Sequence, residues 1–396
     1  MMALAWGLCL VAVLSSIPVC SATRVESARD ALRVDSGAPV SWGAVIANVA
    51  VAGYASAVAY DPVNGYVYVA DEGRQQHPGN VSVVSGTSVV STLEVGKFPD
   101  GVAFNPLNHE VYVANAVCLC SSGGLGNVTL ISGESVVANV RVGAQAGGLA
   151  FDSHNGDMYV ANLWSNNISL LSGSSVVGSI SYPGATYPAG LAYDWTNTNI
   201  YAADEGTPVW PGNVSVVSGS RSIASIRAGT GPTAIAVDNT SGDLYVTNFA
   251  SNNVSVVSAA TNTVSATIPV GTFPDGAAYD TANGAVYVTN QGSANVSVIV
   301  GTTVEANIDV GANPSGVAYD TGNGDLYVAC STGVYVISLN ASAQGVGGSP
   351  WWSLTSLQFY GLILPVVSVM VVALVLIARK KRRGMASVLR GTEQRS

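Results

Sequence analysis

The fold is decided by the stretch Ala234-Ile-Ala-Val-Asp-Asn-Thr-Ser-Gly-Asp-Leu-Tyr-Val-Thr-Asn248 and the short motif Asn253-Val-Ser-Val256 that follows it. Six further segments repeat this pattern, and the tyrosine that they share falls at a regular spacing. The seven tyrosines are Tyr68, Tyr112, Tyr159, Tyr201, Tyr245, Tyr287 and Tyr327, in steps of 44, 47, 42, 44, 42 and 40 residues. A period in this range is typical of a four-stranded β-propeller blade, so we expect seven blades.

Each repeat reads as four short strands. The first is a Gly-Val-Ala-Tyr segment and the second a Leu-Tyr-Val-Thr segment, and in four repeats an Asn-Gly pair such as Asn283-Gly284 lies between them, as in β-hairpins. The third strand is expected at 81–84 and its equivalents, and the fourth at 137–142 and its equivalents. Valine, threonine and tyrosine favour strands, and no stretch of the repeats has the period of a helix. The sequence therefore predicts an all-β protein.

The seventh repeat lacks a fourth strand. Its third strand is expected at 334–337, and the sequence after it loses the pattern. The missing strand is found near the other end of the chain, where Val45-Ile-Ala-Asn-Val-Ala-Val51 matches Val137-Ala-Asn-Val-Arg-Val142. We therefore predict a seven-bladed β-propeller over residues 41–340, whose N-terminal strand completes the last blade and removes the open edges of the array.

These motifs resemble the YVTN β-propeller repeat family. Repeats five and six carry the resemblance most closely, with Tyr245-Val-Thr-Asn248 before Asn252-Asn-Val-Ser-Val256 and Tyr287-Val-Thr-Asn290 before Asn295-Val-Ser-Val298. Other repeats depart from it: Asp71, Asp204 and Cys330 replace the final asparagine, and Ala202 replaces the valine. The resemblance covers residues 41–340 and implies the propeller fold. Because proteins with such repeats are often cell-surface proteins of archaea and bacteria, it also implies a surface location.

The composition excludes several classes of protein. Only 10% of the residues are charged and 48% are hydrophobic, which fits neither a coiled coil nor a charged disordered chain. The formal net charge of −9 excludes a basic nucleic-acid binder, so no nucleic acid is expected as a partner.

Residues 1–22 form the first of two targeting segments. The apolar run from Ala3 to Val19 precedes Cys20-Ser-Ala22, a small-x-small cleavage site, so a secretory signal peptide is predicted. No basic residue precedes the run, which leaves an uncleaved membrane anchor as an alternative. A lipidated Cys20 is a third alternative, which Ile17-Pro-Val19 fits poorly.

The second targeting segment lies at the C-terminal end. Residues 341–356 read as a juxtamembrane linker, and residues 357–378 are 22 positions without a charge. A helix of that length spans about 33 Å, enough for the ~30 Å hydrocarbon core of a bilayer. The basic cluster 379–383 should stay on the cytoplasmic side. We therefore expect a single-pass protein of the cell membrane, with the propeller outside the cell and residues 379–396 as a basic cytoplasmic tail.

Loops of unequal length are expected at one end of the propeller, where the links between second and third strands lie beside the links between blades. Variable loops on one face of a repeat array often form the contact surface, and aromatic and arginine side chains contribute most to binding. The candidate binding residues are Arg74, His77, Phe98, Trp164, Glu205, Trp210 and Phe273. Neutral variation of the loops is the alternative.

Catalysis has little support in the sequence, and no catalytic residue, metal site or cofactor is predicted. The three histidines form no metal-binding pair, and His109 and His154 belong to turns on the face opposite His77. Seven-bladed propellers include lactonases and lyases, which act at the central channel with several acids or with a histidine and a metal. Asp100 and Asp275 each follow a Phe-Pro pair and could reach the channel, but the recurrence of the motif favours a role in blade packing.

Two sets of polar residues recur at fixed positions of the repeat. Acids such as Asp152 and Asp320 follow the first strand and are expected to bond the backbone of their own turn rather than calcium. Asn-x-Ser/Thr sequons precede the third strand in six repeats, which indicates a turn preference and also offers N-glycosylation sites in an extracellular domain. The eight candidate sites are Asn80, Asn127, Asn167, Asn213, Asn239, Asn253, Asn295 and Asn340.

The cysteines fit an oxidising exterior weakly. Cys118 and Cys120 lie in one loop, where a local disulfide is predicted as the simplest pairing, with free thiols as the alternative. Cys330 lies in the seventh repeat, and a bridge from it to the loop would have to cross the mouth of the channel.

These observations favour a membrane-anchored extracellular β-propeller that acts as a non-enzymatic surface module for binding or display. Its partner would be an extracellular protein or a glycan. Two other functions stay open: an exported lactonase- or lyase-like enzyme with its site at the central channel, and a structural component of the cell envelope. Convergence of three or more carboxylates, or of a histidine, at one mouth of the channel would favour the enzyme.

Overall fold

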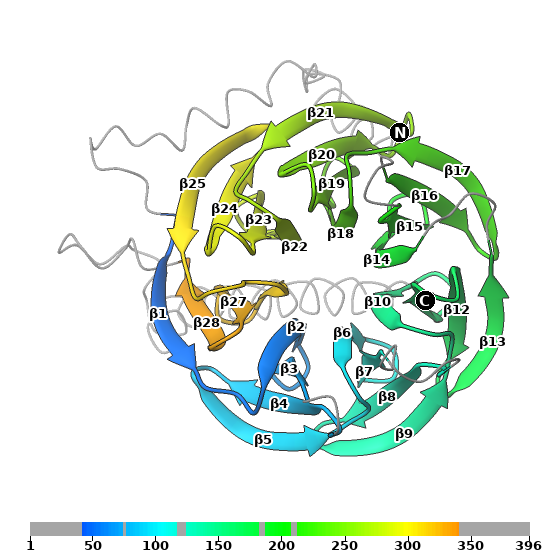
Figure 1. Ribbon diagram of the computed structural model, residues 1–396, viewed down its shortest axis with the longest axis vertical. Coiled ribbons are helices and arrows are strands. Elements are labelled where there is room, and N and C mark those ends of the chain that lie inside the picture. Colours follow the sequence, from blue (N-terminus) through cyan, green and yellow to red (C-terminus); the bar gives the residue numbers. More distant parts are fainter. Residues whose placement is uncertain (1–41, 74–76, 117–123, 182–186, 207–211, 340–396) are drawn as a thin grey trace, which may run out of the picture. The chain divides into compact units, whose positions relative to one another are not determined.

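The computed structural model describes residues 42–73, 77–116, 124–181, 187–206 and 212–339. These residues form 28 β-strands, which pair into seven antiparallel four-stranded sheets arranged as the blades of a ring (Figure 1). The innermost strand of each blade lies beside the innermost strands of its two neighbours, so the ring is closed around a central channel. The all-β seven-bladed propeller that the repeats predict is confirmed.

Six blades consist of four consecutive strands, ordered from the channel outwards. Blade 1 is β2 (Tyr54–Asp61), β3 (Tyr66–Glu72), β4 (Asn80–Ser85) and β5 (Ser88–Glu94). Blade 2 is β6 (Pro99–Asn105), β7 (Glu110–Asn115), β8 (Asn127–Ser132) and β9 (Ser135–Arg141). Blade 3 is β10 (Ala146–Phe151), β11 (Met158–Asn162), β12 (Asn167–Ser172) and β13 (Ser175–Ile180).

The remaining blades continue the series. Blade 4 is β14 (Pro188–Asp194), β15 (Asn199–Asp204), β16 (Asn213–Ser218) and β17 (Arg221–Arg227). Blade 5 is β18 (Pro232–Val237), β19 (Asp243–Asn248), β20 (Asn253–Ser258) and β21 (Thr263–Pro269). Blade 6 is β22 (Pro274–Tyr279), β23 (Ala285–Asn290), β24 (Asn295–Val300) and β25 (Thr303–Asp309).

Blade 7 joins the two ends of the ring. Its order from the channel outwards is β26 (Val317–Tyr319), β27 (Asp325–Cys330), β28 (Gly333–Ser338) and β1 (Ala44–Val49). The outer pair is antiparallel, with Val45 opposite Ile337 and Val49 opposite Val334, so the predicted closure by the N-terminal strand is confirmed. Gly333 has φ +132°, and a Cβ atom there would lie 2.5 Å from the carbonyl oxygen of Val49. A glycine at this position therefore lets β1 approach.

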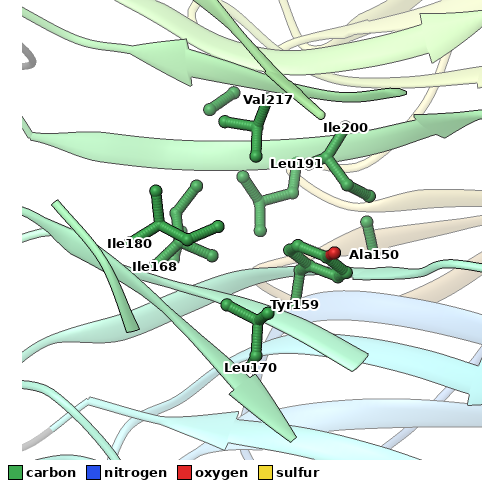
Figure 2. Close-up of a cluster of buried hydrophobic side chains, with 10 residues drawn as sticks. Ala150, Tyr159, Ile168, Leu170, Ile180, Leu191, Ile200 and Val217 are labelled. Atoms are coloured by element: carbon green, nitrogen blue, oxygen red, sulfur yellow. The ribbon is translucent and has the colours of Figure 1, made fainter. Parts of the chain in front are cut away.

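The hydrophobic core lies between blades rather than within a single sheet. Each of the seven blade interfaces contains a cluster of buried apolar side chains. In Figure 2, Tyr159 and Ile168 of blade 3 pack against Leu191 and Ile200 of blade 4. The Tyr159 hydroxyl donates a hydrogen bond to the carbonyl of Gly219 in the next blade. The repeating tyrosine thus fills an interface and also bonds across it, which explains its constant spacing.

The turns between first and second strands are built by the recurring acids. The carboxylate of Asp152 accepts a hydrogen bond of 2.8 Å from the backbone N–H of His154, and that of Asp320 accepts one of 2.7 Å from Gly322. The turn closes when the backbone N–H of Gly156 donates to the carbonyl of Asp152. The expected turn-stabilising contact of these acids is therefore present.

Several predicted segments lie outside the described residues. These are the signal peptide at 1–22, the linker at 341–356, the hydrophobic segment at 357–378 and the tail at 379–396, all of which stay predictions. Within the described ranges, no helix is long and apolar enough to span a membrane.

Candidate functional site

We use the name loop face for one end of the propeller. Strands β3, β7 and β15 finish there, and strands β6, β14 and β22 begin there. The other end, which carries the turns between first and second strands, is the turn face. His109 and His154 lie in turns of the turn face, whereas His77 lies in the link between β3 and β4 on the loop face, as expected. The links that vary in length also belong to the loop face.

A β-bulge near the start of the inner strands turns one residue of each towards the channel. In blade 2, Pro99 pairs with Asn115, and the next pair, Gly101 with Ala114, is out of register by one residue. The residue left over is Asp100, and a bulge re-aims such a side chain. The equivalent residues of the seven blades all line one cavity: Ser56, Asp100, Gly147, Ala189, Thr233, Asp275 and Ser315.

This cavity lies in the channel close to the loop face and has a volume of about 230 Å³. Its wall contains three carboxylates, Asp100, Asp275 and Glu205, together with small residues and backbone. Asp100 and Asp275 both line the channel, the position that the sequence favoured less than a role in blade packing, while the backbone carbonyl of Asp275 also accepts a hydrogen bond from Thr247 in the neighbouring blade. Glu205, a predicted binding residue, joins them from the end of β15.

Glycines that directly follow the bulged residues allow the inner strands to lie close together. A Cβ atom on Gly148 would lie 2.3 Å from the carbonyl oxygen of Ala189, and one on Gly190 would lie 2.2 Å from that of Thr233. Glycine therefore allows neighbouring inner strands to pack backbone to backbone. At the bulged position itself, Oδ2 of Asp100 lies next to Gly147 of the neighbouring blade, and a Cβ atom on that glycine would be 3.0 Å from it.

The hydroxyl groups of the wall are engaged in joining blades. Ser56 donates a hydrogen bond of 2.7 Å to the carbonyl of Pro99 in the next blade, and Ser315 donates one of 2.8 Å to the carbonyl of Ser56. Thr233 likewise donates to the carbonyl of Asp275 at 3.1 Å. These hydroxyls are therefore occupied by the fold.

The carboxylates of the channel repel one another. Burial raises the pKa of Asp275 to about 7, and the charges of Asp100 and Glu205 contribute to the increase. The protein atoms around Asp100 also raise its pKa by desolvation, although its side chain is exposed to solvent in the channel. The pKa values of Glu205 and Glu72 are raised by burial and by the charge of Asp100. Four acids thus share one electrostatic environment, and no basic side chain of the described residues lowers their pKa values.

Aromatic side chains lie on the same loop face, next in sequence to residues that line the cavity: Trp164 follows Leu163, and Tyr187 precedes Pro188. Trp164 and Tyr187 contact each other with ring centroids 6.4 Å apart, and Phe249 and Phe273 stack at 4.9 Å. Trp164 is 52% exposed and Phe273 45% exposed, whereas Phe98 is half-buried. Phe98, Tyr187 and Phe273 each precede the proline of an inner strand, and each has a positive φ, 49°, 64° and 54°.

The remaining predicted binding residues are separated from the central cavity. His77 is exposed and lines a different cavity, of about 510 Å³, together with Tyr54 and Glu72. Arg74 and Trp210 lie outside the described residues. None of the three histidines lines the central cavity, and the described part of the chain holds no group of three or more His, Cys, Asp or Glu residues that could share a metal ion.

The sequons belong to a buried hydrogen-bond network. In blade 5 the amide of Asn248 donates to Oδ1 of Asn253 at 2.9 Å and to the hydroxyl of Ser255 at 2.9 Å. Equivalent sequons open the third strands of five other blades, at Asn80, Asn127, Asn167, Asn213 and Asn295. Asn239 lies instead in the turn between β18 and β19, and Asn340 lies outside the described residues. The fold therefore explains the repeated Asn-x-Ser/Thr pattern, and glycosylation stays a prediction.

Cys330 is a buried free thiol, and burial raises its pKa to about 12. The predicted pair Cys118 and Cys120 lies outside the described residues.

Sequence reasoning missed Glu72, Tyr187 and Phe249, and it gave Asp100 and Asp275 a different role. A usable signal was present for the two aspartates. They occupy a position at which the other repeats carry only serine, threonine, glycine or alanine, so the fold does not require a charge there.

Solved structures of similar fold include lyases. A streptogramin B lyase matches with a TM-score of 0.60 and 13% identity, over 73% of this chain and 95% of that chain. Virginiamycin B lyase from Staphylococcus aureus matches with a TM-score of 0.60 and 12% identity, over 74% of this chain and 97% of that chain, and so does a catalytically inactive form of that enzyme with quinupristin. No protein-family model and no curated protein matches the chain. What this chain shares with these lyases, at such identity, is the propeller fold alone.

Proposed function

We propose that this chain is a membrane-anchored extracellular β-propeller of the YVTN type, and that it acts as a non-enzymatic surface module. Its loop face would bind an extracellular protein or a glycan. The observation that carries this proposal is that two pairs of aromatic rings, Trp164 with Tyr187 and Phe249 with Phe273, lie on the same face as the acidic cavity. Trp164, Tyr187 and Phe273 are exposed, and exposed aromatic side chains are typical of binding surfaces.

Among the described residues, the polar groups of the cavity wall are not arranged as an oriented catalytic pair. A general base needs a partner that orients it and a group that stabilises developing charge. Among the described residues, the carboxylates of Asp100 and Asp275 have no hydrogen-bond donor, and the wall hydroxyls of Ser56 and Ser315 are bonded to backbone carbonyls.

Site-specific photo-crosslinking in cells tests this proposal. The crosslinking amino acid p-benzoylphenylalanine replaces Trp164 or Phe273 on the loop face, and in control variants it replaces Val63 or Leu107, which are 59% and 67% exposed on the turn face. We expect adducts with extracellular molecules from the loop face and none from the turn face. Adducts from the turn face alone, or protection of the propeller from protease added outside intact cells, would contradict the proposal.

A second candidate is an enzyme that acts at the channel. Its support is that three carboxylates, those of Asp100, Glu205 and Asp275, line one cavity of the channel, which is the convergence expected of an enzyme. In addition, a carboxyl group whose pKa is raised to about 7, as that of Asp275 is, can take up a proton at neutral pH. The test is hydrolysis or ring opening of a panel of lactones by the purified full-length chain. Activity that Asp275→Asn abolishes and Glu134→Gln, a change in an exposed turn, preserves would replace the binding proposal with this one.

A further inference from the structure

We propose that the channel cavity binds a positively charged nitrogen on a flexible stem, an alkylammonium or guanidinium group. This deepens the function proposed above and rests on it, since it names the chemistry that the loop face recognises. Two sources supply such a group, a basic side chain of a partner protein and a free polyamine.

The charge of the cavity is the first argument. Asp100, Glu205 and Asp275 line it, and Glu72 lies close enough for its pKa to rise with the charge of Asp100. Within the described residues no salt bridge compensates these acids. A cation that enters the cavity would relieve their mutual repulsion, and because protein surrounds the site its attraction would be screened less than on an open surface.

The second argument is independent of the charge and concerns hydrogen bonding. The buried acids of the turn face accept hydrogen bonds from their own turns: Asp152 accepts from the backbone N–H of His154, and Asp320 from that of Gly322. Asp275 is partly exposed and lines the cavity, and no described residue donates a hydrogen bond to its carboxylate. Its oxygen atoms are therefore open to a ligand that donates hydrogen bonds.

The size and spacing of the site select the kind of cation. A volume of about 230 Å³ is roughly eight times the ~30 Å³ that a water occupies, enough for the end of one long side chain. Among the described residues, no three acids are grouped so that they could hold one metal ion. An ammonium or guanidinium group carries several N–H donors and can reach separated carboxylates, which a bare ion cannot.

The aromatic side chains of the loop face fit the same ligand. Phe249 and Phe273 stack on each other. Phe249 follows β19, the second strand of blade 5, and Phe273 precedes β22, the inner strand of blade 6, two residues before Asp275. Aromatic faces attract ammonium and guanidinium groups. Gly231 occupies in blade 5 the position that Phe273 occupies in blade 6, and its φ of 65° is also positive. The propeller fold therefore does not require a phenylalanine at this position.

Calorimetric titration of the full-length chain in detergent micelles tests the inference. The probes are spermidine, a short peptide with one lysine or one arginine, and the same peptide with acetylated lysine. Titrations at about pH 8.5 keep Asp275 ionised, since its pKa is raised to about 7. We expect binding of at least one charged probe and none of the acetylated peptide, and weaker binding at higher ionic strength.

Matched variants locate the site. Asp100→Asn and Asp275→Asn should each weaken binding about tenfold or more, because a charged hydrogen bond is lost, while Glu134→Gln in an exposed turn removes the same charge and should leave binding unchanged. Thermal unfolding of each variant confirms that it folds. Binding by spermidine alone identifies a free polyamine, and binding by a peptide identifies a partner's side chain.

Two outcomes would overturn the inference: no charged probe binds, or the three variants bind it equally. Neither outcome contradicts the proposed function, because the photo-crosslinking experiment tests that function separately. Loop-face crosslinks without amine binding would leave the binding module in place and remove its cationic ligand.

Discussion

Replacing Asp71 with asparagine isolates the effect of one buried carboxyl group on the stability of the ring. Asp71 is fully buried at the end of β3, where blade 2 has Asn115. The amide of Asn115 donates a hydrogen bond of 3.0 Å to the hydroxyl of Thr129, whereas in blade 1 the hydroxyl of Ser82 donates one of 2.5 Å to Oδ2 of Asp71. Oδ1 of Asp71 is buried and has no hydrogen-bond partner in the described structure.

The size of the effect follows from the pKa. Burial raises the pKa of Asp71 from 3.8 to about 7. The folded state therefore binds more protons than the unfolded state between these values, and stability falls as the pH rises through this window. A difference of about 3 pKa units corresponds to about 4 kcal/mol of unfolding free energy, fully present below pH 4 and lost above pH 7.

Asp71→Asn should remove this loss. Urea unfolding of the variant and the natural chain, followed by circular dichroism, should give similar stabilities at pH 4 and a variant more stable by up to about 4 kcal/mol at pH 8. The reciprocal change Asn115→Asp should create the same pH dependence in blade 2. If the difference between Asp71→Asn and the natural chain is equal at both pH values, the argument from burial is refuted.

Three further changes test other parts of the ring. Deletion of Ala44–Val49 removes β1 and leaves β28 as an exposed edge, so the midpoint of thermal unfolding should fall by about 10 °C or more, and an unchanged midpoint would refute closure by this strand. Tyr327→Phe removes the hydrogen bond from blade 7 to the carbonyl of Gly86 in blade 1 and should cost about 1 kcal/mol in calorimetric unfolding; no loss would show that packing alone holds this interface. Because burial raises the pKa of the Cys330 thiol to about 12, iodoacetamide at pH 8 should modify it only after denaturation, and mass spectrometry that finds it alkylated in the native chain would contradict the buried position.

The ring could be predicted from the sequence because its rules are local and repeat. The spacing of Tyr68 and its equivalents reflects one blade interface after another, and these tyrosines are fully buried or nearly so. The match between Val45–Val51 and Val137–Val142 was enough to place β1 in blade 7, since a closed ring leaves only one position for it.

The channel could not be predicted in the same way, because a bulge breaks the alternation on which strand patterns depend. In an unbroken strand, the neighbours Pro99, Asp100 and Gly101 would alternate between faces. The register shift after Pro99 sends Asp100 to the axis instead, where it meets Asp275 and Glu205 from distant parts of the chain. Their convergence depends on the closed geometry of all seven blades, which no short motif encodes. The predicted glycosylation, the disulfide and the membrane anchor stay predictions.

The position of β28 has a mechanical consequence. It lies between β27 and β1, and the chain leaves the propeller at its end. Tension on the chain beyond Ser338 would pull on a strand held by two ladders, and a pull along the strand loads all of their hydrogen bonds together instead of unzipping them singly. A propeller whose last strand lay at the rim would peel from its edge under the same force, so the borrowed N-terminal strand makes the ring resistant to shear at the point where a tether would act.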